Sequence, residues 1–197
     1  MIKTNIAIKY PAHHSQCLIT NETLYVADYT HQTKNTLVKI GTKLFPKTPP
    51  TDINYFSIIN TPNLDVGGIA FDENSFKYAN GDSRSQCECV VFPDVSLEDS
   101  WIIFVELKYG SNIDFNESHL NKARKQLFKT RTYYSLEAIF DKKKSTSYLI
   151  ASLPLQSEPF PNIALTPAYL QNLKNKHNVI FRVKNLVEIE DNKILLA

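Results

Sequence analysis

The sequence predicts a mixed α/β fold, because β-prone and helical segments alternate along the second half of the chain. Segments rich in β-branched and aromatic residues are bounded by turn-forming residues, as buried strands are. Between them lies a segment whose apolar residues recur at helical spacing. The predicted elements are strands at 66–71, 86–92, 101–109, 146–153 and 179–183, helices at 118–140 and 167–176, and a final hairpin within 186–196.

The first part of the chain has a weaker pattern, and we interpret residues 1–65 as a strand-rich extension of the same domain as the core at 66–197. Short apolar stretches alternate there with Thr, Asn and His, and several prolines follow Phe45. Because proline lacks a backbone N–H and restrains the residue before it, a long helix is not expected at that point. The pair His13 and His14 is expected in a surface loop.

Composition indicates an ordinary globular protein of 197 residues, with 43% hydrophobic and 21% charged residues. This excludes an intrinsically disordered chain, and no apolar run approaches the ~20 residues that cross a bilayer. No secretory signal pattern is present at the start. The cysteines, Cys17, Cys87 and Cys89, are few and odd in number, which favours a reducing compartment. We therefore expect a cytoplasmic protein without a membrane partner.

Positive charge is concentrated in the predicted helix 118–140 and the turn after it, although the net charge of the chain is only +2. Such a cluster fits the phosphate backbone of a nucleic acid. A solvated helix face without a ligand is the alternative interpretation. The candidate nucleic-acid-binding residues are Lys122, Arg124, Lys125, Lys129 and Arg131.

Two acidic residues and a lysine are predicted to meet on adjacent strands. Glu106 and Lys108 are two apart on one strand, so their side chains point to the same side. An antiparallel hairpin with its turn centred near residue 97 places Glu88 opposite Glu106, with Cβ atoms roughly 4.5–5.5 Å apart. Two such carboxylates can share Mg²⁺ or Mn²⁺. Cys87 and Cys89 alternate with Glu88 and are expected on the opposite, apolar face. A simple ion pair at the strand end is the alternative.

In this order, the motifs resemble the core of the PD-(D/E)XK nuclease superfamily. The segments that carry the resemblance are 85–92 with Glu88, 103–110 with Glu106 and Lys108, and 123–127 with Gln126. Members share a strand with a metal-binding acid, a second strand ending in Glu-x-Lys, and a helix with a polar residue. The resemblance implies a restriction-endonuclease-like core, in which helices flank a central mixed β-sheet.

The resemblance also implies a Mg²⁺- or Mn²⁺-dependent nuclease that acts on DNA rather than RNA, in restriction, repair or anti-phage defence. According to this resemblance, Glu88, Glu106 and the backbone carbonyl of Leu107 hold the metal. Lys108 positions the attacking water or stabilises the charged transition state. Gln126 contacts metal-bound water or the scissile phosphate.

Position 88 departs from the family pattern, because Glu88 stands where members usually carry Asp. Asp82 is the alternative acid, and Glu22 and Asp28 are candidates for the further acid that many members place near the N-terminus. A catalytically inactive subunit of the same fold, binding nucleic acid or a partner protein, is the alternative function. A homodimer or an operon-encoded partner would supply specificity, and an interaction role for residues 1–65 is a third hypothesis.

Overall fold

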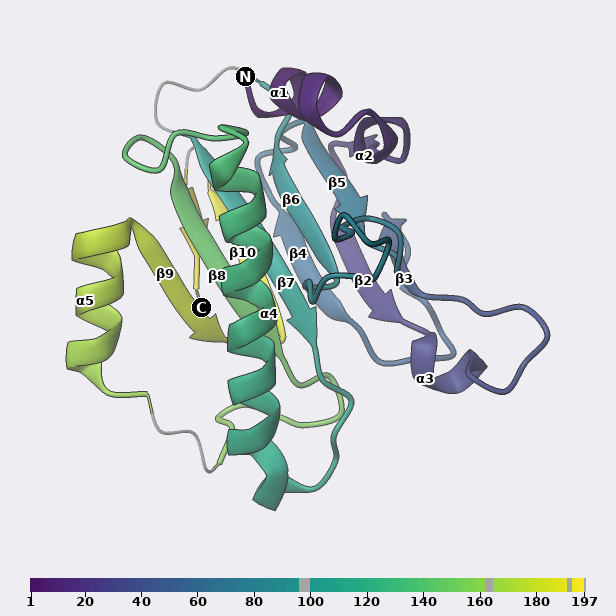
Figure 1. The fold of residues 1–197 in the computed structure, drawn as a ribbon. Helices are drawn as coiled ribbons and strands as arrows, with labels where there is room; N and C mark the ends of the chain where they lie inside the picture. Colours follow the sequence, from purple (N-terminus) through teal and green to yellow (C-terminus); the bar gives the residue numbers. More distant parts are fainter. Residues whose placement is uncertain (96–99, 162–164, 191–192, 197) are drawn as a thin grey trace.

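The computed structural model describes residues 1–95, 100–161, 165–190 and 193–196. These residues form an α/β structure of two mixed β-sheets and several helices, stacked in three layers (Figure 1). Helices cover one face of the larger sheet, and the smaller sheet packs against its other face. The elements are α1 (Ile2–Lys9), α2 (Pro11–Ser15), β1 (Leu18–Thr20), β2 (Leu24–Asp28), α3 (Thr30–Thr33), β3 (Thr42–Pro46), β4 (Phe56–Asn60), β5 (Val66–Ala70), β6 (Cys89–Pro93), β7 (Trp101–Leu107), the 3-10 helix η1 (Ile113–Phe115), α4 (Asn116–Leu136), β8 (Thr146–Ser152), α5 (Pro167–His177), β9 (Val179–Val183), β10 (Leu186–Glu190) and β11 (Lys193–Leu195).

Strand β7 lies inside the larger sheet, whose described strands are ordered β1-β5-β6-β7-β8-β9. It pairs antiparallel with β6 and parallel with β8. Every residue of β7 is buried, because both faces of the sheet are covered, and this explains its nearly continuous apolar sequence. Phe104 packs toward the helices, whereas Ile103 and Val105 pack toward the smaller sheet. Glu106 shares the side of Phe104 and therefore lies on the helix side of the sheet.

The smaller sheet joins the two ends of the chain, with its described strands ordered β11-β10-β4-β2-β3. β10 pairs parallel with β4 in a register that places Leu186 opposite Ser57. Residues 1–65 therefore share a sheet with the C-terminal hairpin and a hydrophobic cluster with β7. The predicted hairpin within 186–196 is confirmed, because β10 and β11 pair antiparallel; residues 191–192 lie outside the described part. The extension also begins with the helices α1 and α2, which the sequence reasoning did not predict.

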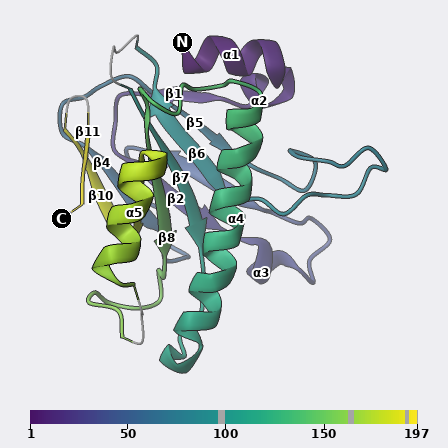
Figure 2. The same cartoon turned by 60° about the vertical axis from the view of Figure 1, so that its left-hand side comes forward.

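The helix layer is built around α4, which crosses the face of the larger sheet beside α5 (Figure 2). The predicted apolar positions Leu120, Ala123 and Leu127 are buried against the sheet. Arg131 is also buried, and its Nη2 donates to the carbonyl of His177 at 2.9 Å. The prediction that Arg131 binds nucleic acid is therefore wrong, because this position continues the buried stripe of α4 and joins it to α5. In the described part of the chain, no helix is long and apolar enough to span a bilayer.

His13 also differs from its prediction, since it is only 3% exposed while His14 is exposed. Its ring stacks on Tyr10 with centroids 4.7 Å apart. Its two ring nitrogens lie 3.2 Å from the hydroxyl of Tyr134 and 2.8 Å from the carbonyl oxygen of Ser75. The expectation of a surface pair is thus wrong for His13, because helices α1 and α2 close over this end of the core.

Candidate active site

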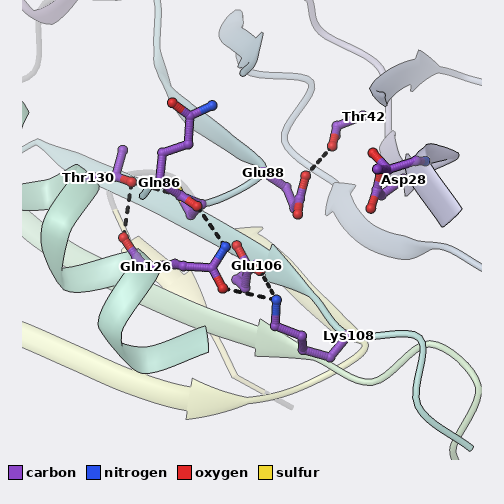
Figure 3. Close-up of polar contacts among 10 residues, drawn as sticks. Asp28, Thr42, Gln86, Glu88, Glu106, Lys108, Gln126 and Thr130 are labelled. Atoms are coloured by element: carbon purple, nitrogen blue, oxygen red, sulfur yellow. Dashed lines mark hydrogen bonds and ion pairs between the residues drawn. The ribbon is translucent and has the colours of Figure 1, made fainter. Parts of the chain in front are cut away.

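The end of β7 places a fully buried carboxylate beside an ammonium group (Figure 3). Oε1 of Glu106 is paired with Nζ of Lys108. Oε2 of Glu106 is buried and has no hydrogen-bond partner among the described residues. Burial raises the pKa of Glu106 well above its ordinary value, the charge of Glu88 raises it further, and Lys108 opposes the shift. An unpartnered buried oxygen destabilises the protein unless a ligand satisfies it.

Gln126 on α4 completes a hydrogen-bonded chain with this pair. Nζ of Lys108 donates to Oε1 of Gln126 at 3.0 Å, and Nε2 of Gln126 donates to the carbonyl of Gln86 at 2.8 Å. One turn further along α4, the hydroxyl of Thr130 accepts from the backbone N–H of Cys87 at 2.8 Å. Helix α4 is thereby tied to the segment before β6. The structure brings together Glu106, Lys108 and Gln126, as the sequence predicted.

Glu88 is not paired with Glu106 as predicted, and its side chain takes another direction. The register that places Cys89 opposite Val105 is the predicted one, but it ends there, and Glu88 lies just before β6; the turn near residue 97 lies outside the described residues. The ladder is irregular here, because the N–H of Glu88 donates to the carbonyl of Val105 at 3.0 Å. As a result Cys87 packs on the helix side and Cys89 on the other side, so the prediction of a shared face is wrong.

The carboxylate of Glu88 points toward the smaller sheet, where its Oε2 accepts a hydrogen bond from Oγ1 of Thr42 on β3 (Figure 3). Burial raises the pKa of Glu88 to about 7, and the charge of Asp28 at the end of β2 contributes to the increase. Asp28 also raises the pKa of Glu106, so the three acids lie within electrostatic reach of one another. Glu22 lies elsewhere, where it pairs with Lys47 at 3.7 Å.

Two further predicted metal ligands have different outcomes. Asp82 lies in an exposed turn, where its carboxylate accepts from Nδ2 of Asn80 at 2.7 Å, so the structure does not bring it to Glu106. Leu107 is the last residue of β7. The N–H of the next residue, Lys108, donates to the carbonyl oxygen of Ser152 on β8. Because backbone groups alternate sides along a strand, the carbonyl of Leu107 faces the side on which Glu88 lies.

The remaining basic residues lie on α4 around Gln126. Lys122, Lys125 and Lys129 are exposed, and Lys122 and Lys129 are one turn from Gln126 on either side. Arg124 is half-buried, and its guanidinium lies 5.7 Å from the ring centroid of Tyr169 on α5. The three exposed lysines therefore form a positive stripe next to the site.

The donor set fits a hard cation that the substrate helps to bind. No group of three or more His, Cys, Asp or Glu in the described part of the chain is placed to hold a metal by itself. Mg²⁺ is usually bound by one or two carboxylates together with substrate phosphate and water. A divalent cation would give a partner to Oε2 of Glu106, which has none among the described residues. It would also stabilise the charged form of Glu88, whose pKa is raised. The free Oε2 of Glu106 thus fits Mg²⁺ or Mn²⁺, and Glu88 would have to turn away from Thr42 to share the ion.

Comparisons of the chain with protein-family models, with curated proteins and with solved structures found no match. The sequence did not predict Thr42, which binds the Glu88 carboxylate. It also did not predict Lys34, Lys39 and Arg84, which line a cleft beside Glu88. They come from the smaller sheet and from loops, and no motif or periodicity in the sequence marks them.

We expect Mg²⁺ to stabilise the protein more near pH 8 than near pH 6. The pKa of Glu88 rises from its ordinary value of 4.5 to about 7, so the metal-free native state binds a proton that the unfolded state has released. The contribution of Glu88 to stability is therefore present below about pH 4.5 and is lost as the pH rises through about 7. A cation must displace this proton, so its affinity increases with pH.

The measurement is the melting temperature by circular dichroism across this pH range, with and without Mg²⁺. Glu88→Gln should reduce the pH dependence of the Mg²⁺ effect, because an amide does not titrate and only the raised pKa of Glu106 remains. A Mg²⁺ effect of equal size at both pH values in the wild type would contradict the assignment of Glu88.

Proposed function

We propose that this protein is a metal-dependent nuclease of the PD-(D/E)XK type that hydrolyses phosphodiester bonds, in DNA rather than RNA. The observation that carries the proposal is the buried Glu106 carboxylate, which lies within electrostatic reach of Glu88. One of its oxygens is paired to Lys108, and the other has no partner among the described residues. The order β6, β7, α4, β8 along the chain is consistent with a restriction-endonuclease-like core.

In this proposal each side chain has a separate task. A bound divalent cation would activate water and neutralise charge on the phosphate. Glu106 and Glu88, with the Leu107 carbonyl, would hold that cation. Lys108, oriented by Oε1 of Gln126, would donate to the phosphate oxygen on which negative charge develops. The lysine stripe of α4 would attract the nucleic-acid backbone.

The wild-type protein is expected to cleave DNA with Mg²⁺ or Mn²⁺ and to lose this activity in EDTA. Lys108→Met should lower the rate about a hundredfold or more, because a positioned donor at the developing charge is removed. Lys174→Met, at an exposed position on α5, should cleave like the wild type. Cleavage is measured by gel electrophoresis under single-turnover conditions. A wild-type protein that leaves all DNA and RNA forms intact with either metal would argue against the proposal.

A catalytically inactive subunit that binds nucleic acid or a partner protein is the second candidate. The hydrogen bond from Thr42 favours it, because it holds the Glu88 carboxylate away from Glu106. Calorimetry separates the two functions. Millimolar Mg²⁺ binding that is lost in Glu88→Ala supports the nuclease, whereas nucleic-acid binding without any metal binding supports the inactive subunit.

A further inference from the structure

A cleft of about 700 Å³ opens beside Glu88 and Gln126. One wall is the segment 30–42, which contributes Lys34 and Lys39, and the other is the segment 71–88, which contributes Arg84. Acidic groups also line it. They are Asp72, Glu73 and Glu88. The Glu88 carboxylate accepts a hydrogen bond from Thr42, and that of Asp72 accepts hydrogen bonds from Asn74 and Ser75 in its own turn. Cations from both segments thus line the cleft next to the candidate active site.

Arg84 is held against two tyrosine rings in this cleft. Its guanidinium carbon lies 3.8 Å from the ring centroid of Tyr133 and 5.2 Å from that of Tyr78. The hydroxyl of Tyr133 donates to the carbonyl of Ser85 at 3.0 Å, which fixes the ring. Nε of Arg84 is buried without a hydrogen-bond partner, and Arg84 takes part in none of the ion pairs among the described residues. Stacking leaves the N–H groups in the guanidinium plane able to bind an anion.

We infer that the cleft binds one strand of a nucleic acid and that Arg84 holds a phosphate adjacent to the one that is cut. The inference rests on the proposed function, because it describes the substrate of the same site. The planar fork of Arg matches two phosphate oxygens, whereas Lys34 and Lys39 act as point charges on the opposite wall.

The size of the cleft selects a single strand. Its volume of about 700 Å³ is that of a pocket for a drug-sized ligand, which corresponds to about two nucleotides. Basic side chains that contact the backbone, as Lys34, Lys39 and Arg84 would here, are also typical of proteins that bind single strands.

The test is binding in EDTA, measured by fluorescence anisotropy with a labelled oligothymidylate and with a duplex of the same length. The wild type should bind the single strand more tightly. Arg84→Gln, whose planar amide can still stack on Tyr133, should bind it about tenfold more weakly, because one charged hydrogen-bonded contact is lost. Lys77→Gln, at an exposed position of the same segment outside the cleft, should bind like the wild type.

A series of oligothymidylates, each with one neutral methylphosphonate linkage, then locates the contact. One position should weaken binding to the wild type but not to Arg84→Gln. Should Arg84→Gln melt at a lower temperature than the wild type, Arg84→Lys replaces it and should also lose the position-specific effect, because it lacks the fork. The inference would be overturned if each linkage lowered the affinity of the wild type and of Arg84→Gln equally. It would also be overturned if the wild type bound the duplex as tightly as the single strand.

These outcomes are distinct from failure of the proposed function, because binding is measured without metal. A protein that binds the single strand through Arg84 but never cleaves it would contradict only the nuclease. A protein that cleaves duplex DNA and is indifferent to Arg84→Gln would contradict only the inference.

Discussion

Glu106→Gln is expected to abolish metal-dependent cleavage while the protein remains folded. The amide has the shape of the carboxylate and can still accept from Lys108, but it lacks the charge that a divalent cation requires. Losing activation by the metal raises the activation free energy of cleavage by several kcal/mol, so the cleavage rate should fall about a thousandfold or more. No other single substitution at the site should have a larger effect on activity.

The same variant should be as stable as the wild type, or more stable, in metal-free buffer at neutral pH. The native state of the wild type buries a carboxylate whose pKa is raised well above its ordinary value, so ionising it opposes folding, and an amide removes that cost. Single-turnover cleavage and urea unfolding measure the two effects. Glu137→Gln, at an exposed position, is the matched control and should change neither. Cleavage by Glu106→Gln at the wild-type rate would show that the carboxylate is not required.

Phe104→Ala should lower the free energy of unfolding by about 3–5 kcal/mol, the range for loss of a buried aromatic ring. Phe104 is fully buried on β7, where its ring centroid lies 6.1 Å from that of Tyr134 on α4 and 6.3 Å from that of Phe140. Removing the ring leaves a cavity between the sheet and its covering helix. Typical domains have only about 5–15 kcal/mol of stability, so this variant should be close to unfolding at body temperature.

Urea unfolding followed by the fluorescence of Trp101, the single Trp of the chain, measures this loss. Phe115→Ala is the matched control, because the same ring is removed from a residue that is 56% exposed. Its effect should stay within about 0.5 kcal/mol. Equal losses in the two variants would show that β7 and α4 are not held together by the packing described here.

The elements that carry the candidate site were predictable because their signals are local. The continuous apolar run of β7 indicates a strand buried on both faces, and the structure has it so. The pairing of β6 with β7 follows from the symmetry of a hairpin, and the observed register agrees with it as far as Cys89 and Val105. The spacing of Leu120 and Leu127 likewise predicts the face of α4 that lies on the sheet.

Other features depend on segments that are far apart in the chain. The pairing of β4 with β10 joins the two ends of the protein, and no local pattern specifies it. The direction of the Glu88 carboxylate depends on an irregularity in the ladder and on Thr42, which comes from the other sheet. His13 and Arg131 were placed incorrectly because a polar residue in a helix can be buried wherever a distant element supplies its partner.

By itself, the sequence determined a mixed α/β fold, a buried β7 with Glu106 near its end and Lys108 directly after it, and a helix that presents Gln126 to them. Only the tertiary structure decided that a second sheet covers the far face, that Thr42 and Asp28 face Glu88, and that Arg84 lines the adjacent cleft. The physical reason is that periodicity reports whether a residue meets an apolar surface, whereas the identity of that surface is set by packing between layers.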